Sequence, residues 1–296
     1  MKKSLFFWCC CMAYSAIFAQ LPNTDLFLID LRLNKKGNCS VQGQPQNLTN
    51  RNGYDNQPAF LPDGKNILFT AAQNEAKTDI YRLHLPDKST QNLTQTPLTG
   101  EYSAQPAATK GAFTVVRVEE NDKTQRLWLF THNQPPQLHQ PHIEPVGYYA
   151  TTQKNKQLAM FVLGSPPTLQ VAAAADTAGV IAAVNIGRCI LPAPGKPNSV
   201  LFLHKISNQN WLIKRLHTET LDTKTIAKAL PDAEDFAALP NEGLLMASGS
   251  KLYCFNPQTN QWKVIADFSA IGIKNITRLA LSPDAQKLVF VAEINP

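Results

Sequence analysis

The chain has 296 residues, of which 44% are hydrophobic, and a formal net charge of +6. This length is within reach of one large all-β domain and is sufficient to bury a core. No run of like charges concentrates the basic excess, so the sequence lacks the basic stripe of a nucleic-acid-binding surface. We attribute the charge to solubility.

The N-terminus has the layout of a secretory signal peptide. Lys2 and Lys3 precede the uncharged, mostly apolar run 5–18, and Ala19 is a small residue at a plausible cleavage point. We therefore predict a signal peptide over 1–19, cleaved after Ala19, and a periplasmic or secreted mature chain. The apolar run is short for a membrane span, which needs about 20 residues. The alternatives are an uncleaved anchor or a lipidated N-terminus.

Two β-rich runs follow, 25–32 (DLFLIDLR) and 41–49 (VQGQPQNLT), and then the first of several hairpins. Pro62-Asp63-Gly64 separates AFL from the β-branched and aromatic run NILFT. Proline and glycine favour a tight turn, and two short β-rich runs around such a turn predict a β-hairpin.

The same hairpin recurs along the chain. Its turn residues are 63, 110, 154, 194, 241 and 283, so consecutive turns are 40 to 47 residues apart. This spacing is close to the period of about 40–45 residues expected of propeller blades. Each of the first five hairpins is followed by two more β-rich runs, which makes four strands per unit.

The sixth hairpin ends the chain with two strands, and the N-terminal segment 25–49 supplies the two that are missing. We therefore predict an all-β fold in which 20–296 forms a single six-bladed β-propeller of four antiparallel strands per blade. The N-terminal strands complete the last blade, which closes the ring and protects its sheet edges. A β-sandwich with coincidental spacing is the alternative.

Two of the hairpins carry a recognisable motif. The chain resembles the TolB-type, WD40-like β-propeller repeat at Tyr54 to Gly64 with Ile67 to Thr70, and again at Leu281 to Asp284 with Lys287 to Phe290. The run Tyr102 to Ala107 is a weaker match. The resemblance implies an exported scaffold that binds a partner through one face or through the channel. It does not imply the particular partners of TolB.

We find no catalytic motif in the sequence. A Gly-x-Ser-x-Gly nucleophile elbow and a phosphate-binding glycine-rich loop are both absent. His139, His142 and Glu144 lie within six residues and are weak candidates for a metal site. Pro141 indicates a loop there, so we favour a solvated connection and predict neither a metal nor a cofactor.

Three acidic residues precede the inner strands that we expect in their blades: Asp55, Glu101 and Glu144. They are candidates for a ring of carboxylates at one mouth of the channel, where they would hold Ca²⁺ or a basic side chain. Charged turn residues that simply face water are the alternative. Tyr54 and Tyr102 are expected at equivalent positions, where aromatic rings suit contact with a peptide or a sugar. Packing between blades would explain them equally well.

Two further features have structural interpretations. Asn47, Asn92 and Asn275 lie in Asn-x-Thr sequons, and we interpret the first two as part of the repeat. The predicted mature chain keeps Cys39, Cys189 and Cys254, so at most one disulfide can form. We interpret the three cysteines as structural core residues.

These observations predict an exported, non-enzymatic binding module or scaffold. Its expected partner is an envelope or secreted protein or peptide, with no role for nucleic acid and no membrane span after signal cleavage. The predicted binding residues are Tyr54, Asp55, Glu101, Tyr102 and Glu144. The rival hypothesis is a glycan-acting or metal-dependent enzyme, or a carbohydrate-binding propeller, that uses the central channel.

Overall fold

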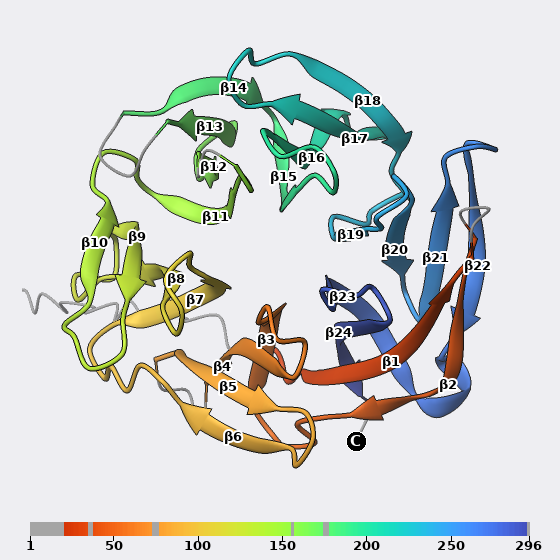
Figure 1. Cartoon of the computed structure of the whole chain (residues 1–296), viewed down its shortest axis with the longest axis horizontal. Coiled ribbons are helices and arrows are strands. Elements are labelled where there is room, and N and C mark those ends of the chain that lie inside the picture. The colour runs from red at the N-terminus through yellow and green to blue at the C-terminus, as the bar shows by residue number, and fades with distance from the viewer. Residues whose placement is uncertain (1–20, 35–37, 73–76, 155–156, 174–177, 295–296) are drawn as a thin grey trace, which may run out of the picture.

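The computed structural model describes residues 21–34, 38–72, 77–154, 157–173 and 178–294. Its strands form six four-stranded antiparallel sheets arranged in a ring (Figure 1). The innermost strands or their flanking residues line a cavity in the middle of the ring, which we call the channel. The predicted six-bladed β-propeller is therefore confirmed. The predicted signal peptide, 1–19, lies outside the described residues.

Each blade places its strands in order from the channel to the rim. Blade 1 contains β3 (Tyr54–Phe60), β4 (Asn66–Ala72), β5 (Asp79–His84) and β6 (Ser89–Asn92). Blade 2 contains β7 (Gly100–Pro106), β8 (Phe113–Val118), β9 (Gln125–Phe130) and β10 (Gln137–Gln140). Blade 3 contains β11 (Val146–Thr151), β12 (Leu158–Val162), β13 (Thr168–Ala172) and β14 (Val180–Val184).

The remaining blades follow the same pattern. Blade 4 contains β15 (Ile186–Pro192), β16 (Ser199–Ser207), β17 (Asn210–His217) and β18 (Thr223–Lys228). Blade 5 contains β19 (Phe236–Ala238), β20 (Leu244–Ser248), β21 (Lys251–Asn256) and β22 (Gln261–Asp267). Blade 6 contains β23 (Ile273–Leu281), β24 (Lys287–Ile294), β1 (Asp25–Leu33) and β2 (Cys39–Asn47), and the short helix η1 (Ser269–Ile271) precedes it.

Blade 6 closes the ring with strands that are far apart in the sequence. β1 pairs with β24 in a continuous antiparallel register from Asp25 opposite Ala292 to Asp30 opposite Lys287. β2 then pairs with β1 at the rim. The predicted completion of the last blade by the segment 25–49 is confirmed, and all six predicted turns join the first and second strands of a blade.

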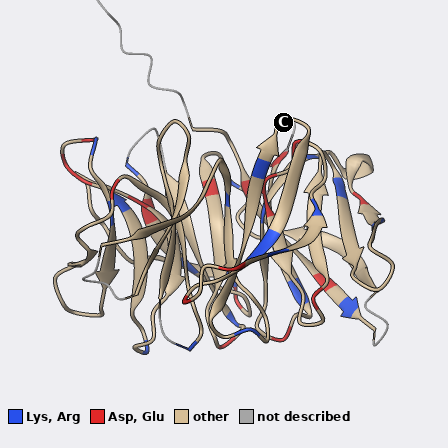
Figure 2. Cartoon of the chain, turned by 90° about the horizontal axis from the view of Figure 1, so that it is seen from above, with Lys and Arg blue, Asp and Glu red and all other residues tan. Residues whose placement is uncertain are grey.

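The two faces of the ring carry different loops. Every inner strand begins at one face, which we call the entry face, and the turns between second and third strands lie there too. The six predicted turns lie on the opposite face, the exit face. β1 begins and β24 ends at the entry face, and Figure 2 shows the ring from the side with the C-terminus at one face.

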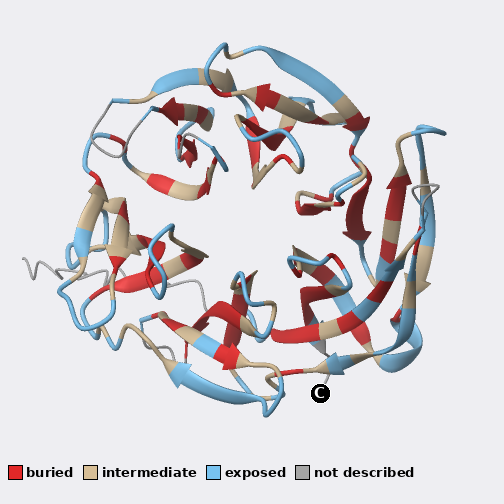
Figure 3. Cartoon of the chain, in the orientation of Figure 1, coloured by how far each residue is buried: buried red, intermediate tan, exposed pale blue. Residues whose placement is uncertain are grey.

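The hydrophobic core is divided among the seams between blades. The described residues form six clusters of buried apolar side chains, and each cluster joins residues of two neighbouring blades. Figure 3 shows the buried residues concentrated toward the channel side of the blades and exposed stretches along outer strands such as β6, β14 and β18. One blade cannot bury both faces of its sheet alone, whereas a closed ring buries them all.

The two Asn-Leu-Thr sequences form hydrogen bonds between the third and fourth strands of their blades. The side-chain amide of Asn47 and the hydroxyl of Thr49 donate hydrogen bonds to the carboxylate of Asp25, over 2.8 and 2.9 Å. The next blade repeats this arrangement with Asp79, Asn92 and Thr94. The structure thus gives the two sequons a structural role within the repeat.

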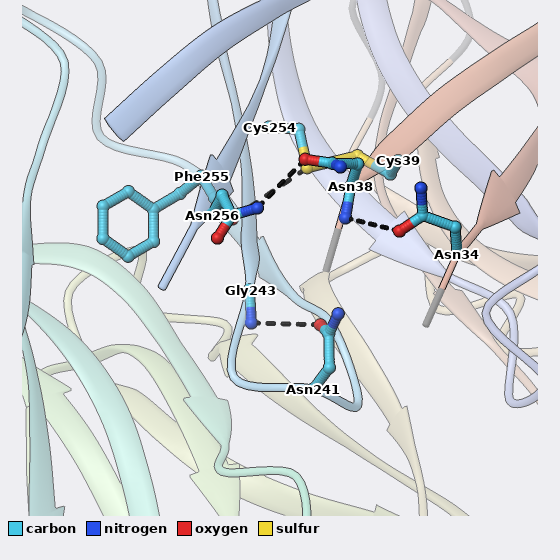
Figure 4. Close-up of a disulfide and its surroundings, with 8 residues drawn as sticks. All are labelled: Asn34, Asn38, Cys39, Asn241, Gly243, Cys254, Phe255 and Asn256. Carbon is cyan, nitrogen blue, oxygen red and sulfur yellow. Dashed lines mark hydrogen bonds between the residues drawn. A yellow bond between two sulfur atoms is a disulfide. The ribbon is translucent and has the colours of Figure 1, made fainter. Parts of the chain in front are cut away.

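A disulfide joins the closing blade to its neighbour. Cys39 at the start of β2 is bonded to Cys254 in β21, and the two cysteines are 215 residues apart in the sequence (Figure 4). The side-chain amide of Asn256 donates to the side-chain oxygen of Asn38 beside it, over 3.0 Å. The sequence permitted one disulfide but did not identify the pair. Cys189 is a free thiol.

Candidate functional site

Asp55 and Glu101 occupy equivalent places in blades 1 and 2. Each is the second residue of its inner strand, and its backbone N–H donates to a threonine carbonyl of the preceding blade, Thr24 at 3.1 Å or Thr78 at 2.9 Å. Both residues are fully buried. The expectation that they precede their strands and ring a channel mouth is not met, because each carboxylate lies in the seam between two blades.

The two seam carboxylates have different partners. Asp55 accepts a hydrogen bond from the Arg51 guanidinium through one oxygen, while its other oxygen has no hydrogen-bond partner. Glu101 is contacted by the Arg117 guanidinium at 3.0 Å and by two threonine hydroxyls. Burial raises the pKa of Asp55 to about 6, because Arg51 offsets only part of the burial effect. Burial also raises the pKa of Glu101.

Tyr54 and Tyr102 are not equivalent in the strand register. Tyr54 pairs with Ala72, the last residue of β4 in blade 1. The last residue of β8 in blade 2 is Val118, and it pairs with Gly100, not with Tyr102. The strand pairing shows that Asp55 corresponds to Glu101. Aligning the two blades on their Gln-Pro-Ala sequences therefore shifts one blade by two residues relative to the strand register. Tyr54 is buried, and burial raises the pKa of its hydroxyl. Tyr102 is half-buried.

The third acidic residue, Glu144, precedes β11 as predicted and is exposed, 3.9 Å from Arg126. His142 beside it is exposed, and His139 lies within β10, where burial lowers its pKa. No set of three or more histidine, cysteine or acidic side chains in the described part of the chain converges as a metal site would require.

The structure reveals a polar cluster across the channel that none of the predicted residues belongs to. Its members come from the inner strands or their immediate flanks in five of the six blades, and we call it the channel cluster. They are Asn56 in blade 1, Tyr148 in blade 3, Arg188 in blade 4, Asp235 in blade 5 and Arg278 in blade 6.

Arg278 spans the channel at the centre of this cluster. Its Nη2 donates to the Tyr148 hydroxyl at 2.8 Å on the opposite blade, Nε donates to Asn56 Oδ1 at 3.2 Å, and Nη1 donates to Asp235 Oδ1 at 3.1 Å. All three guanidinium nitrogens are therefore occupied. A bulge interrupts the pairing of β23 beside Arg278, between Thr277 and Ala280, and bulges re-aim the side chains of a strand.

Arg188 and Asp235 form a two-bond ion pair at the wall of the channel. Arg188 donates from Nε to Oδ1 at 3.0 Å and from Nη2 to Oδ2 at 2.5 Å. Such a fork is stronger and more directional than a single charged hydrogen bond. The pairing of β15 is also interrupted here, between Ile186 and Ile190.

The electrostatics of the channel cluster favour the charged forms of Asp235 and Arg188. Burial alone would raise the pKa of Asp235, but the hydrogen bonds and charges of Arg188 and Arg278 outweigh it and lower the pKa. Burial opposes the charge of Arg188 as well, and Asp235 reverses that effect and raises the pKa of the guanidinium. The channel therefore holds two cations and one anion across the physiological range.

Two cavities adjoin this cluster. One, of about 110 Å³, lies within the channel and is lined by residues of all six inner strands or their flanks, including Gln57, Ser103 and Arg278. The other, of about 300 Å³, lies on the entry face of blades 4 to 6 and is bordered by the segment 231–235 and the turn 247–249. Arg188 and Asp235 line both cavities.

Sequence reasoning missed the channel cluster, although a weak signal was present. Tyr148, Arg188, Asp235 and Arg278 each lie five or six positions ahead of the turn residue of their own blade. Aligning the blades on their turns would have placed them at one level of the channel. Their residue types differ from blade to blade, so no motif marks them.

The strand order and the ring define the class of fold: this chain is a six-bladed β-propeller. No family model matches the sequence, and no curated protein matches it. Solved structures do match its fold. A putative TolB from Agrobacterium tumefaciens is similar with a TM-score of 0.70 and 11% identity, over 93% of this chain and 99% of that one.

Other solved propellers share the fold at lower similarity. TolB from Acinetobacter baumannii has a TM-score of 0.57 and 10% identity, over 91% of this chain and 64% of that one. An oligogalacturonate lyase in complex with manganese has a TM-score of 0.52 and 11% identity, over 93% of this chain and 98% of that one. At these identities the likeness concerns the fold alone. In the ranges that the structure describes, no helix has the length and apolar character needed to cross a membrane.

Proposed function

We propose that this protein is an exported, non-enzymatic binding module that holds a segment of an envelope or secreted protein at the entry face. The observation that carries the proposal is the channel cluster, in which five blades direct polar side chains to one place beside a cavity of about 300 Å³. Ligands of ring-shaped folds bind where several repeats converge, because such a site combines loops from different parts of the chain.

Two observations support export. The first twenty residues have the composition of a signal peptide. The Cys39–Cys254 disulfide belongs to an oxidising compartment, because disulfides are rare in proteins of the reducing cytosol. The similarity to two TolB structures supports a binding role. The similarity to an oligogalacturonate lyase is what supports the rival enzyme hypothesis.

A pull-down from solubilised envelope tests the proposal and its choice of face. Ser248 is exposed at the rim of the 300 Å³ cavity, and Thr259 is exposed in the β21–β22 turn on the exit face of the same blade. We expect Ser248→Trp to block the cavity and abolish capture, while Thr259→Trp captures the same partner as the unmodified protein.

Each result has a defined meaning. Loss of capture with Thr259→Trp alone would move the site to the exit face and overturn our choice of face. Failure of the unmodified protein to capture any specific protein would overturn the proposal that its partner is a protein. Circular dichroism and a thermal melt of both variants confirm that the ring is intact.

A further inference from the structure

From the geometry of the channel we infer that the ligand of this module presents a carboxylate, which Arg188 binds. The inference rests on the proposed function, since it names the chemical group that the same site recognises. The argument uses the charge of the channel, its unused hydrogen-bond donors and the size of its cavities.

The channel cluster has an excess of positive charge. Arg188 and Arg278 share a single carboxylate, Asp235, whose side chain is 9% exposed. Close by, Glu234 is paired with Lys205 over 2.7 Å, so this pair adds no net charge. Asp232 lies at the rim of the larger cavity but is exposed, where solvent screens its charge.

Donors without partners surround the smaller cavity. Arg188 uses Nε and Nη2 on Asp235, and its Nη1 makes no hydrogen bond to the described residues. Gln57 accepts hydrogen bonds through its side-chain oxygen, which leaves its amide group free to donate. The Ser103 hydroxyl is buried and has no partner in the described part of the chain.

The one carboxylate that lines the smaller cavity, Asp235, is already occupied. Asp235 accepts from both arginines through Oδ1 and from Arg188 through Oδ2. A ligand that complements the site must therefore bring acceptor atoms and negative charge. A carboxylate does both and matches the fork of a guanidinium, which favours two parallel hydrogen bonds.

The cavity volumes limit the size of the bound group. About 110 Å³ within the channel admits a carboxylate with the few atoms attached to it, and the adjoining cavity of about 300 Å³ leaves room for the next part of the ligand. Drug-sized ligands fill roughly 300–1,000 Å³. The channel therefore suits the end of a larger ligand, such as the C-terminus of a peptide, or a small free acid.

The test compares three probes by titration calorimetry or NMR. They are N-acetyl-trialanine with a free C-terminal carboxylate, the same peptide as its C-terminal amide, and glutarate. We expect a carboxylate probe to bind with a dissociation constant of about 1 mM or below, and the amide to bind at least about tenfold more weakly, since a charged hydrogen bond is lost. Tighter binding of the peptide acid assigns the carboxylate to a peptide terminus, and tighter binding of glutarate assigns it to a small acid.

Variants locate the site. Arg188→Gln should weaken carboxylate binding about tenfold to a hundredfold. Arg215→Gln serves as the matched control, because this arginine lies in the same blade and pairs with the exposed Glu242. Ser103→Ala should weaken binding about fivefold without lowering the melting temperature, because its hydroxyl has no partner to lose. A merely structural serine would lower the melting temperature and leave affinity unchanged.

Equal binding of the acid and the amide, or full affinity in the Arg188→Gln variant, would overturn the carboxylate inference. This failure is distinguishable from failure of the proposed function. A partner captured in the pull-down without any preference for the acid overturns only the inference. A clear preference for the acid without a captured protein overturns only the protein-partner proposal.

Discussion

Asp55 and Asp235 are both buried carboxylates of the inner layer, and they differ in the sign of their pKa shift. Asp55 lies in a seam with one arginine contact and one oxygen without a partner, and its pKa is raised to about 6. Asp235 lies in the channel, where two arginines contact it from separate blades and its pKa is lowered.

The comparison shows that burial alone does not decide the state of a carboxylate. Desolvation acts in the same direction on both groups, so the number and geometry of the donors determine the outcome. In the seam, one cation leaves a residual preference for the neutral acid. In the channel, two guanidiniums contact one carboxylate, which leaves a net positive charge. This net charge is what makes the place suitable for an anionic ligand.

The largest effect is expected from Asp235→Asn. This change keeps the shape of the side chain but leaves two guanidiniums without their anion, and breaking a buried ion pair in this way costs about 3–5 kcal/mol. Urea unfolding at pH 7 measures the loss in free energy. Asp55→Asn is the matched control, and an equal loss in that variant would remove the distinction between seam and channel.

The pH dependence of stability should separate the two residues next. Because the pKa of Asp55 is raised above its ordinary value, its contribution is fully present below about pH 4 and is lost as the pH rises through about 6. A shift of this size corresponds to about 3 kcal/mol. The unfolding free energy of the unmodified protein should therefore fall between pH 4 and pH 8, and we expect Asp55→Asn to remove this fall. Asp235, whose pKa is lowered, loses its contribution only below about pH 4.

Unfolding free energies of both proteins across this range are the measurement. If the unfolding free energies of the unmodified protein and of Asp55→Asn fell in parallel from pH 4 to pH 8, the inference that the pKa of Asp55 is raised would be wrong.

Glu101→Gln should act in the same direction as Asp55→Asn and to a smaller extent. The pKa of Glu101 is also raised by burial, but Arg117 and two hydroxyls hold the charged form. The pH dependence of unfolding in the single variants and the double variant shows whether the two seams act independently. Additive slopes are expected, since each carboxylate lies in its own seam.

The smallest effect is expected from Asp30→Asn, in β1 of blade 6. Asp30 pairs with Lys287 over 2.6 Å, and both side chains are at least 40% exposed. Exposed pairs contribute about 0–1 kcal/mol and weaken with salt. Unfolding at low and high salt tests this, and a salt-independent loss comparable to that of Asp235→Asn would show that exposure is not the deciding variable.

The sequence was informative about the fold because each blade repeats a local signal. Pro62, Asp63 and Gly64 form a turn by their own backbone preferences, and Ser282 to Asp284 form another. Such signals depend on neighbouring residues only. Their spacing therefore revealed the blades, and the incomplete last copy revealed how the ring closes.

The candidate site was not predictable in the same way. Arg188, Asp235 and Arg278 are 43 to 90 residues apart, and only the circular arrangement brings them together. The sequence grouped Asp55 and Glu101 with Glu144 at a channel mouth. The strand register shows that the first two occupy equivalent places, but alternation along the strand turns their side chains into a seam rather than to the channel. Bulges decide whether a residue of an inner strand points to a seam or to the channel, and the residue types in these strands do not reveal where the bulges lie.

The pairing of β1 with β24 orders events during synthesis. The ribosome produces β1 and β2 first and β24 last, so the strand that β1 needs as a neighbour is absent until almost the whole chain has emerged. β1 can pair at once with β2 along one edge, but its other edge has no partner until β24 is made, and loss of loop entropy delays such distant contacts. The ring of a nascent chain of this design therefore cannot close before β24 has been made.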